Sequence, residues 1–369
     1  MNRLKNILVS FLHYIKSCPR SILHLIRNRN LWSKKETYYP EAKYHKSSFC
    51  IFCEQLLCIL KYGEINDFYF LYGFDTKNRK QCNEYIQHSE FRVKRNKRNY
   101  TPFNWVNVLR DKELFAIVGE SYGIPTIKTI GILKKTDIYY RNGENIDLID
   151  YLSEHNNIQL FLKPLNDECG KGIFTINVVD GQIFLRENSI TKLLLREYLE
   201  KLGHNEFIVQ ERLGQHAEMN RLYNKSINTL RIITIRNSDG KPSFFDSLLR
   251  IGANDNVVDN WARGGLAVGV LPNGLLKKEA YFKPPFGKIA VKHPNSEVKF
   301  EGFKIPYYEE AVNLAINFHE KIKGVYAIGW DVSITKDGPV FVEGNDNFEI
   351  SLHQACNKGM KKEIITLLK

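Results

Sequence analysis

Residues 326–347 constrain the fold more than any other stretch of the chain. They read as two apolar strands joined by a tight turn, because the Asp337-Gly338 pair stands between apolar runs, a pattern typical of a β-hairpin. We predict a three-residue loop over 336–338, in which Gly338 takes the left-handed conformation. The C-terminal part of the chain is therefore expected to form antiparallel sheet.

The predicted hairpin brings hard oxygen ligands together. Its three-residue loop places Asp331 opposite Glu343, and Asn345 shares a face with Glu343 because side chains alternate along a strand. Carboxylate and amide oxygens are ligands that Mg²⁺ takes beside substrate phosphates. For this trio alone, the alternative is that the polar residues cap strand ends near solvent.

Composition and charge narrow the class of protein. The chain has 369 residues, of which 43% are hydrophobic, so it is long enough for two or three globular domains. The net charge of +12 is concentrated in residues 1–35, which hold eight Lys/Arg and no acid, whereas the remainder holds 45 Lys/Arg against 41 Asp/Glu. This distribution argues against nucleic-acid binding by the main body. Seven cysteines without a cleavable signal indicate reduced thiols, and we expect a cytoplasmic protein.

The N-terminal arm, residues 1–35, is basic and amphipathic. Apolar side chains recur at helical spacing between Leu4 and Ile15, and basic residues flank this stripe. A basic amphipathic helix is typical of contact with an anionic membrane surface, here the inner face of the cell membrane. The alternative is a helix packed on its own domain. No apolar run is long enough to span a membrane.

Residues 36–105 are predicted to form a mainly helical N-terminal region. The segment 47–63 carries three cysteines, but no partner cluster follows at zinc-site spacing. We therefore interpret this segment as a buried helix rather than a metal site. The basic run 92–98 is interpreted as a solvated linker.

From residue 106 onward, strands dominate. A helix is predicted over 109–123, with Gly123 as its stop. Four Asp-Gly or Asn-Gly pairs predict hairpin turns, at 180–181, 239–240, 273–274 and 337–338. Further helices are expected at about 188–203, 307–323 and 351–369. The pattern favours an α+β fold built on antiparallel sheets.

A glycine-rich loop over 166–172 follows an apolar strand that carries Lys163. Gly170 and Gly172 would let the backbone lie close to an anion, with N–H groups directed at it. Lys163 and Lys171 add positive charge, so the segment suits a triphosphate. The alternative is a plain hairpin.

Two further apolar strands carry arginines. Arg231 enters a β run and needs an anionic partner there. Residues 248–265 gather Arg250, Asn260 and Arg263 before a Gly-Gly turn, and two arginines suit a carboxylate or phosphate substrate. The alternatives are a surface salt bridge and a β-bulge.

Taken in order, these segments resemble the ATP-grasp superfamily. They are most similar to the sugar-transfer-associated ATP-grasp proteins of polysaccharide biosynthesis, and more distantly to the glutamate-ligase type. The resemblance covers about residues 106–350 and implies an ATP-grasp fold, in which two α+β lobes with antiparallel sheets clamp ATP. The chain would then comprise an arm, a helical region, an N-lobe with a triphosphate lid and a C-lobe with the metal and acceptor site, over 1–35, 36–105, 106–213 and 214–369.

The resemblance also implies roles for single residues. Lys112 in DKELF and Lys163 in FLKP resemble phosphate-binding lysines, and the loop to Gly172 resembles the triphosphate lid. VQERL resembles the adenine hinge, and its candidate nucleotide contacts are Gln210, Glu211 and Leu213. Either His216 or Glu218 would meet the ribose. The candidates that face phosphate and acceptor are Arg231, Arg250, Asn260 and Arg263, and the implied metal ligands are Asp331, Glu343 and Asn345.

In this superfamily ATP phosphorylates a carboxylate, and an amine or another nucleophile then attacks the acyl phosphate. The resemblance implies such a ligase in cell-surface glycan assembly, with ATP and Mg²⁺ as cofactors and glycan-precursor carboxylates and amines as substrates. Arg231 or Arg250 would stabilise the oxyanion at the acyl centre. Two alternatives stay open: a kinase-like phosphotransferase acting on a sugar or alcohol, and a non-catalytic nucleotide-binding subunit of a membrane-surface glycan-synthesis complex.

Overall fold

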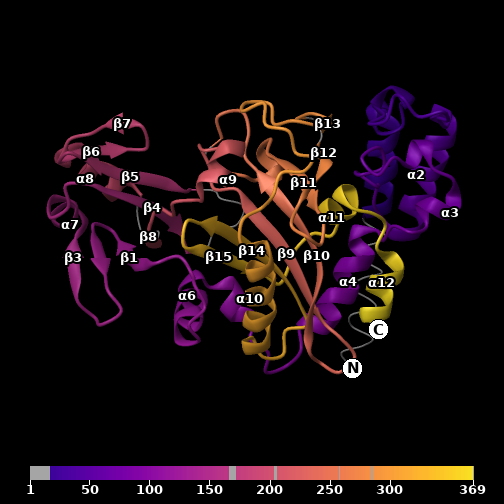
Figure 1. Ribbon diagram of the computed structural model, residues 1–369. Coiled ribbons are helices and arrows are strands. Elements are labelled where there is room, and N and C mark those ends of the chain that lie inside the picture. Colours follow the sequence, from indigo (N-terminus) through magenta and orange to yellow (C-terminus); the bar gives the residue numbers. More distant parts are fainter. Residues whose placement is uncertain (1–16, 166–171, 203–205, 257, 284–285, 369) are drawn as a thin grey trace.

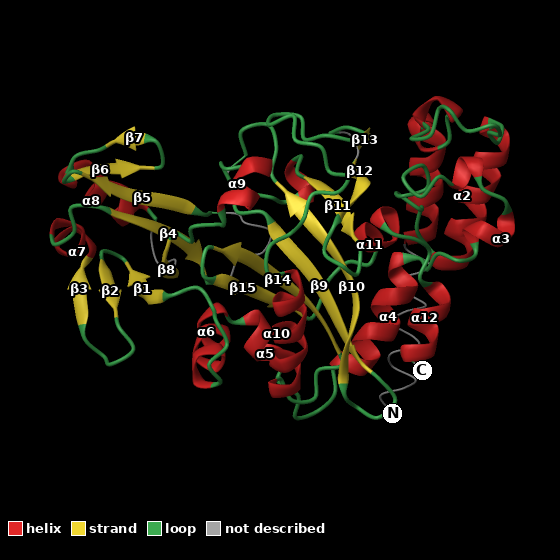
Figure 2. Ribbon diagram, viewed as in Figure 1, coloured by secondary structure: helices red, strands yellow, loops and turns green. Residues whose placement is uncertain are grey.

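The computed structural model describes residues 17–165, 172–202, 206–256, 258–283 and 286–368. Two antiparallel sheets stand side by side, and a helical region packs at the far side of the second sheet (Figure 1). Figure 2 shows that the first two parts combine a sheet with helices, while the third part is mostly helical. The expected α+β architecture with a mainly helical N-terminal region is confirmed.

The first sheet has eight strands in the order β3-β2-β1-β8-β4-β5-β6-β7. Helices α7 (Leu148–Ser153) and α8 (Lys192–Lys201) supply apolar side chains to its core. The predicted strand with Lys163 is β4, and the segment 207–213 largely forms β8. The strand bounds are β1 Thr129–Lys134, β2 Asp137–Tyr139, β3 Asn145–Asp147, β4 Ile158–Pro164, β5 Phe174–Val179, β6 Gln182–Leu185, β7 Asn188–Ser189 and β8 Glu206–Glu211.

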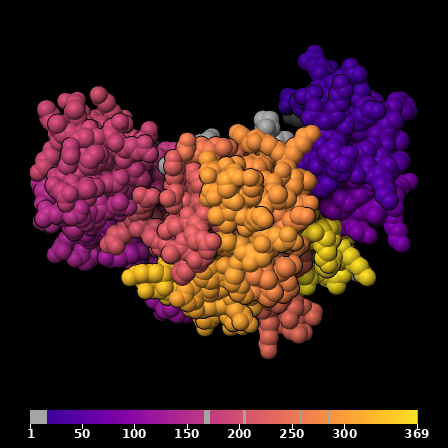
Figure 3. All heavy atoms as spheres, turned by 45° about the horizontal axis from the view of Figure 1, so that its top comes forward, coloured from indigo at the N-terminus to yellow at the C-terminus, as the bar shows by residue number. Residues whose placement is uncertain are grey.

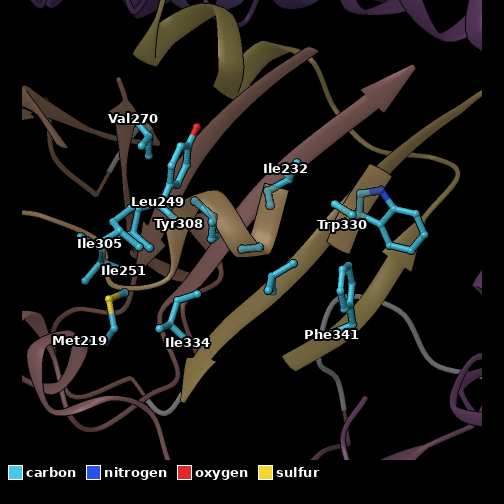
Figure 4. Close-up of a cluster of buried hydrophobic side chains, with 14 of the residues drawn as sticks. Met219, Ile232, Leu249, Ile251, Val270, Ile305, Tyr308, Trp330, Ile334 and Phe341 are labelled. Atoms are coloured by element: carbon cyan, nitrogen blue, oxygen red, sulfur yellow. The ribbon is translucent and has the colours of Figure 1, made fainter. Parts of the chain in front are cut away.

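The second sheet has seven strands in the order β13-β12-β11-β10-β9-β14-β15. Helix α10 (Tyr308–Lys321) packs on one face, where Phe318 stacks on Trp330 with ring centroids 5.0 Å apart. Figure 4 shows Trp330 of β14 and Phe341 of β15 close together in this core. The strand bounds are β9 Thr229–Arg236, β10 Pro242–Ile251, β11 Leu266–Val270, β12 Leu276–Phe282, β13 Ile289–Ala290, β14 Ala327–Thr335 and β15 Gly338–Asn345.

All four predicted hairpins form, but the loop of the last one is shorter than expected. Thr335 pairs with Gly338, so the loop has two residues and not three. Asp331 still pairs with Glu343, because a register shift after Asp331 leaves Val342 without a direct partner and moves the pairing by one residue. A β-bulge, and not the turn, therefore sets the predicted pair.

The helix predicted over 109–123 is two helices, α5 (Val106–Arg110) and α6 (Lys112–Ser121). Asp111 divides them, because its carboxylate accepts hydrogen bonds from the first N–H groups of α6, at 2.9 and 3.0 Å. Gly123 follows the end of α6 with φ of 66°, as predicted. Phe115 and its neighbours pack into the core of the second sheet, so Lys112 begins a helix that rests on this sheet.

The helical region combines the N-terminal and C-terminal segments of the chain. Its elements are a helix over residues 17–27, η1 Arg29–Leu31, η2 Lys34–Glu36, α2 Ser48–Tyr62, η3 Phe74–Thr76, α3 Arg79–Cys82, α4 His88–Asn99, α11 Ser351–Cys356 and α12 Lys361–Leu367. The helix expected over 351–369 is therefore interrupted, and the two others expected are α8 and α10. Within the described ranges, no helix is long and apolar enough to cross a membrane.

One interpretation of this region is confirmed only in part, because the helix predicted over 47–63 forms as α2 but is not fully buried, and a second interpretation was wrong. Helix α2 was expected to be buried, but only one face is, and Phe49 and Leu57 on the other faces are 75% and 64% exposed. The basic run 92–98 is not a linker but the middle of α4, whose Arg95 and Asn99 are fully buried. A run of charges in sequence hides the helical period, by which every third or fourth residue can face a core.

Candidate functional site

A narrow pocket lies where the two sheets approach each other, and residues of both sheets and of α6 line it. Figure 3 shows the surface notched between the first-sheet lobe and the central body. The polar side chains that line the pocket include those of Lys112, Lys163, Gln210 and Glu343. Its apolar lining includes Phe115, Ile127 and Phe341. Segments more than 200 residues apart in sequence, from Lys112 to Glu343, thus contribute to one site.

The two predicted phosphate-binding lysines both face this pocket. Lys112 Nζ donates to the carbonyl oxygens of Pro164 and Leu165, at 3.2 and 3.3 Å, just before the loop 166–172. For Lys163, no hydrogen-bond acceptor is found among the described residues, and its ammonium lies 5.4 Å from the Phe161 ring centroid. Burial lowers the pKa of Lys163 to about 8, with the charge of Lys112 acting in the same direction. An anionic ligand would relieve both effects.

Glu343 enters the pocket from the second sheet. Asn345 Nδ2 donates to Glu343 Oε1 at 3.2 Å, so the two side chains share a face as predicted. Burial and the neighbouring carboxylate of Asp331 raise the pKa of Glu343. A cation beside Glu343 would offset both causes.

Arg231 and Arg250 converge on Asp331. Arg231 forms a two-pronged pair with the carboxylate, with Nη2–Oδ2 at 2.9 Å, and Arg250 Nη1 lies 3.4 Å from the same Oδ2. Arg250 Nη2 also donates to Asp259 Oδ1 at 3.0 Å. Burial would raise the pKa of Asp331, but the two guanidinium groups outweigh it and lower this pKa. Two arginines, on β10 and β9, therefore face one carboxylate on β14, beside Glu343 of β15.

Asp259 is a buried partner of Arg250 that the sequence analysis did not single out. It is 7% exposed, and besides Arg250 it accepts a hydrogen bond from the Thr229 backbone N–H at 3.0 Å. A usable signal was present, because two arginines in apolar strands need buried anionic partners. Asp259 directly precedes Asn260, the candidate that the sequence indicated.

The donor set fits Mg²⁺ only in part. Glu343 lines the pocket, and Asn345, which donates to it, lies on the same face of β15, so both carry hard oxygens near one another. Both carboxylate oxygens of Asp331 are instead engaged by Arg231. In the described part of the chain, no group of three or more His, Cys, Asp or Glu side chains could hold a metal ion. Glu343 and Asn345 are therefore the residues that would hold the ion together with ATP, and Asp331 as a ligand stays a prediction.

The predicted nucleotide hinge lies along β8. Gln210 is 6% exposed, its Nε2 donates to Thr129 Oγ1 at 3.3 Å, and its Oε1 has no partner among the described residues. The Glu211 carboxylate turns away to pair with Lys128 at 2.6 Å. Leu213, just after the strand, is half-buried. Of the three, only Gln210 lines the pocket.

The two ribose candidates are not separated by their contacts. His216 caps α9 (Ala217–Leu222), accepting from the Glu218 backbone N–H at 3.1 Å. The Glu218 carboxylate pairs with Arg221 at 2.5 Å and lines a second, open groove. Neither residue lines the pocket that holds Lys163.

The remaining candidates have other surroundings. The Asn260 side chain caps the short helix η4 (Trp261–Arg263) by accepting from Ala262 N–H at 2.9 Å, and the Arg263 side chain is exposed. The structure does not bring these two to the pocket. Gly172 has φ of 68° and is exposed, while Gly170 and Lys171 lie outside the described residues.

Two lobes with antiparallel sheets, and lysines and a carboxylate facing one pocket between them, define an ATP-grasp protein. The family model described as sugar-transfer associated ATP-grasp matches residues 90–366. The chain belongs to this family. The match includes most of α4, which lies before the region of the expected resemblance.

Several solved structures are similar to this chain at low identity. A D-alanine–D-alanine ligase from Coxiella burnetii is 11% identical, with 71% of this chain and 57% of that chain covered and a TM-score of 0.37. An ATP-grasp RimK domain protein from Sphaerobacter thermophilus is 14% identical, with 71% and 69% covered and a TM-score of 0.39. An N5-carboxyaminoimidazole ribonucleotide synthetase in complex with ADP is 12% identical, with 66% of this chain and 46% of that chain covered and a TM-score of 0.37. The chain thus spans about half the length of that synthetase. No curated protein sequence matches this chain.

Proposed function

We propose that this protein is an ATP-dependent ligase that joins a carboxylate to an amine, or to another nucleophile, through an acyl phosphate. One observation carries the proposal. Lys112 and Lys163 face Glu343 across a pocket between the two sheets, and the paired arginines lie next to Glu343 on the same sheet. The proposed phosphate site and the proposed carboxylate site would thus be adjacent, as transfer of a phosphoryl group to a carboxylate requires.

The reaction would proceed in two displacements. A substrate carboxylate oxygen attacks the γ-phosphorus of ATP, and the bond to the β-phosphate bridging oxygen breaks to release ADP. The amine then attacks the acyl carbon of the acyl phosphate, phosphate leaves, and the amine loses a proton. Bound Mg²⁺ would supply charge neutralisation at the phosphates.

The residues of this chain would bind and orient the reactants. Lys163, which has no hydrogen-bond acceptor within the described chain, would donate to a phosphate oxygen. Arg231 and Arg250 would bind the substrate carboxylate and the oxyanion that forms at its carbon. Asp331 and Asp259 fix both guanidinium groups in place, so they are oriented before substrate binds.

The proposed setting is cell-surface glycan assembly at the cytoplasmic face of the membrane. Its support is the sugar-transfer association of the family and the basic arm over residues 1–35. The substrates would be glycan precursors or small molecules with carboxylate and amine groups, and we propose no nucleic-acid partner. ATP and Mg²⁺ are the proposed cofactors.

A screen of ADP formation tests the function. Purified protein would be given Mg·ATP with pairs of carboxylates and amines, including amino acids and glycan precursors, and products would be weighed by mass spectrometry. ADP release that needs both partners, with a product lighter than their sum by one water, supports the ligase. ADP release with a sugar or alcohol alone would mean a phosphotransferase, and nucleotide binding without turnover across the screen would favour a non-catalytic subunit.

A further inference from the structure

We propose that α4 and its neighbours form a positioning clamp for the end of β15 that carries the proposed metal ligands, Glu343 and Asn345. The α4 clamp consists of Arg95, Asn99, Tyr100 and Arg110, and it holds the segment 346–348 that follows Asn345 directly. Figure 2 shows α4 beside the second sheet, next to α12. The inference rests on the proposed function, because the clamp would position residues of the proposed nucleotide site. It gives a role to the helical region, for which the sequence shows no motif.

Asn99 joins the two strands of the hairpin beyond their last ladder pair. That pair is Gly329 with Asn345. Asn99 Nδ2 donates to the Ala327 and Asp346 carbonyl oxygens, at 2.9 and 3.2 Å, and its Oδ1 accepts from the Ala327 N–H at 2.9 Å. A fully buried side-chain amide therefore replaces the backbone bonds that the ladder no longer supplies.

Asp346 receives the second set of contacts. It is 4% exposed, and Arg110 binds both of its oxygens, with Nε–Oδ1 at 3.1 Å and Nη2–Oδ2 at 2.8 Å. The Tyr100 hydroxyl donates to Oδ2 at 2.7 Å. Two-pronged pairs of this kind fix direction as well as distance. Asp346 thus cannot rotate without breaking three hydrogen bonds.

Arg95 supplies the third set. It is fully buried between the rings of Phe91 and Phe348, and it donates to the Phe348 carbonyl oxygen and to Asn347 Oδ1. Burial lowers its pKa to about 10. No ion pair joins it to a carboxylate among the described residues. A buried charge used to hold backbone is costly, which indicates that the held segment must be positioned well.

The position of β15 explains why such a clamp is needed. β15 is the last strand of its sheet, so only one edge is paired by a neighbouring strand. Its other edge is held by the Phe341 N–H, which donates to Pro125 O at 2.8 Å, and by the bridge of Phe341 with Thr126. Glu343 and Asn345 lie beyond that point. The α4 clamp is thus the next restraint along the chain after the ligands, and small displacements of ligands weaken binding sharply.

The test measures Mg²⁺ binding to the ADP complex by calorimetry, in Arg110→Gln and in the control Lys97→Gln. Lys97 is an exposed cation on α4, so its loss changes the same charge without touching β15. We expect Arg110→Gln to raise the Mg²⁺ dissociation constant about tenfold, the loss expected from one charge-assisted pair, with metal-free ADP binding unchanged. Arg110→Lys should restore part of the Mg²⁺ affinity that Arg110→Gln loses. Tyr100→Phe, which removes one hydroxyl, should give a smaller change and keeps the test available if Arg110→Gln fails to fold.

A purely structural role would lower the melting temperature of Arg110→Gln and Tyr100→Phe and leave their Mg²⁺ dissociation constants equal to that of Lys97→Gln. That result would overturn the clamp. Failure of the proposed function would look different: the wild-type protein would bind Mg·ADP, respond to the clamp variants, and yet form no product with any carboxylate and amine.

Discussion

Lys163 of β4 and Glu343 of β15 belong to different sheets, and they line the same pocket. Burial lowers the pKa of Lys163 to about 8, while the carboxylate of Glu343 acts in the opposite direction. The first sheet therefore carries a cation poised near neutral pH, and the second sheet carries the acid that faces it.

We first predict the effect of Lys163 on nucleotide binding. Lys163→Ala removes a charge-assisted phosphate contact of roughly 1.5–3 kcal/mol, so the ATP dissociation constant should rise about tenfold or more. In the wild type, affinity should weaken from pH 7 to pH 9, because the ammonium loses its proton near pH 8. Lys163→Arg should bind independently of pH over this range. Calorimetry across this pH range measures the ATP dissociation constants of the wild type and both variants. An unchanged dissociation constant in folded Lys163→Ala would remove Lys163 from the site.

Glu343→Gln separates metal binding from folding. In the wild type, burial and Asp331 raise the pKa of the Glu343 carboxyl group, so the ionised carboxylate opposes folding at neutral pH. Glu343→Gln should therefore melt at a temperature no lower than the wild type while it binds Mg²⁺ more weakly and stops turnover. A lower melting temperature, or Mg²⁺ binding at wild-type strength, would contradict this assignment. Differential scanning calorimetry with and without Mg²⁺ provides both readouts.

The sequence predicted the hairpin, because strand alternation and turn residues are local properties, but it predicted the pairing of Asp331 with Glu343 from a three-residue loop that does not form. It did not specify the bulge that sets this register, since Val342 looks like any other strand residue. Arg95 and Asp259 were missed for a related reason. Both are buried charges whose partners, Phe348 and Arg250, are identified only by tertiary packing.

Asp259 should contribute strongly to stability. It is buried against Arg250, and removing one member of a buried ion pair costs about 3–5 kcal/mol, because the other charge loses its partner. Asp259→Ala should lower the free energy of unfolding in urea by that amount. The control is Asp255→Ala, which breaks the exposed pair with Lys225 and should change little. Equal effects of both variants would mean that Asp331 alone satisfies Arg250.

Stability should fall in mild acid through a buried histidine. His319 is fully buried, Nδ1 accepts from Thr234 Oγ1 at 2.7 Å, and burial lowers its pKa to about 3. The unfolded chain binds a proton at this residue near pH 6.5, so stability present above that pH is lost as pH falls toward 3, at up to about 1.4 kcal/mol per pH unit. His319→Gln should remove this part of the slope between pH 7 and 5, and the exposed-site control His24→Gln should not. If the unfolding free energy, measured in urea, fell with the same slope against pH in the wild type and in His319→Gln, the role of His319 would be refuted.

The last prediction concerns the basic arm, for which the structure fixes where to cut. Leu25 is fully buried in a cluster with Ile59 and Ile65, and Ser21 Oγ donates to Gly63 O at 3.1 Å. Residues 17–35 therefore belong to the folded helical region. A truncation at residue 36 would remove core, whereas a chain that starts at residue 17 leaves this packing intact.

We propose that residues 1–16, with the basic residues that follow, contact anionic membrane. Each basic residue near such a surface contributes on the order of 1 kcal/mol, and the apolar stripe from Leu4 to Ile15 adds to it. The full-length chain should pellet with anionic vesicles at low salt and less so as salt shortens the Debye length. The chain starting at residue 17 should stay in solution, and it should melt at the wild-type temperature. If both chains pelleted equally, the membrane contact would lie in other residues. A lower melting temperature of the shortened chain would show that the arm packs on its own protein, because the loss of a purely membrane-facing segment leaves the folded core unchanged.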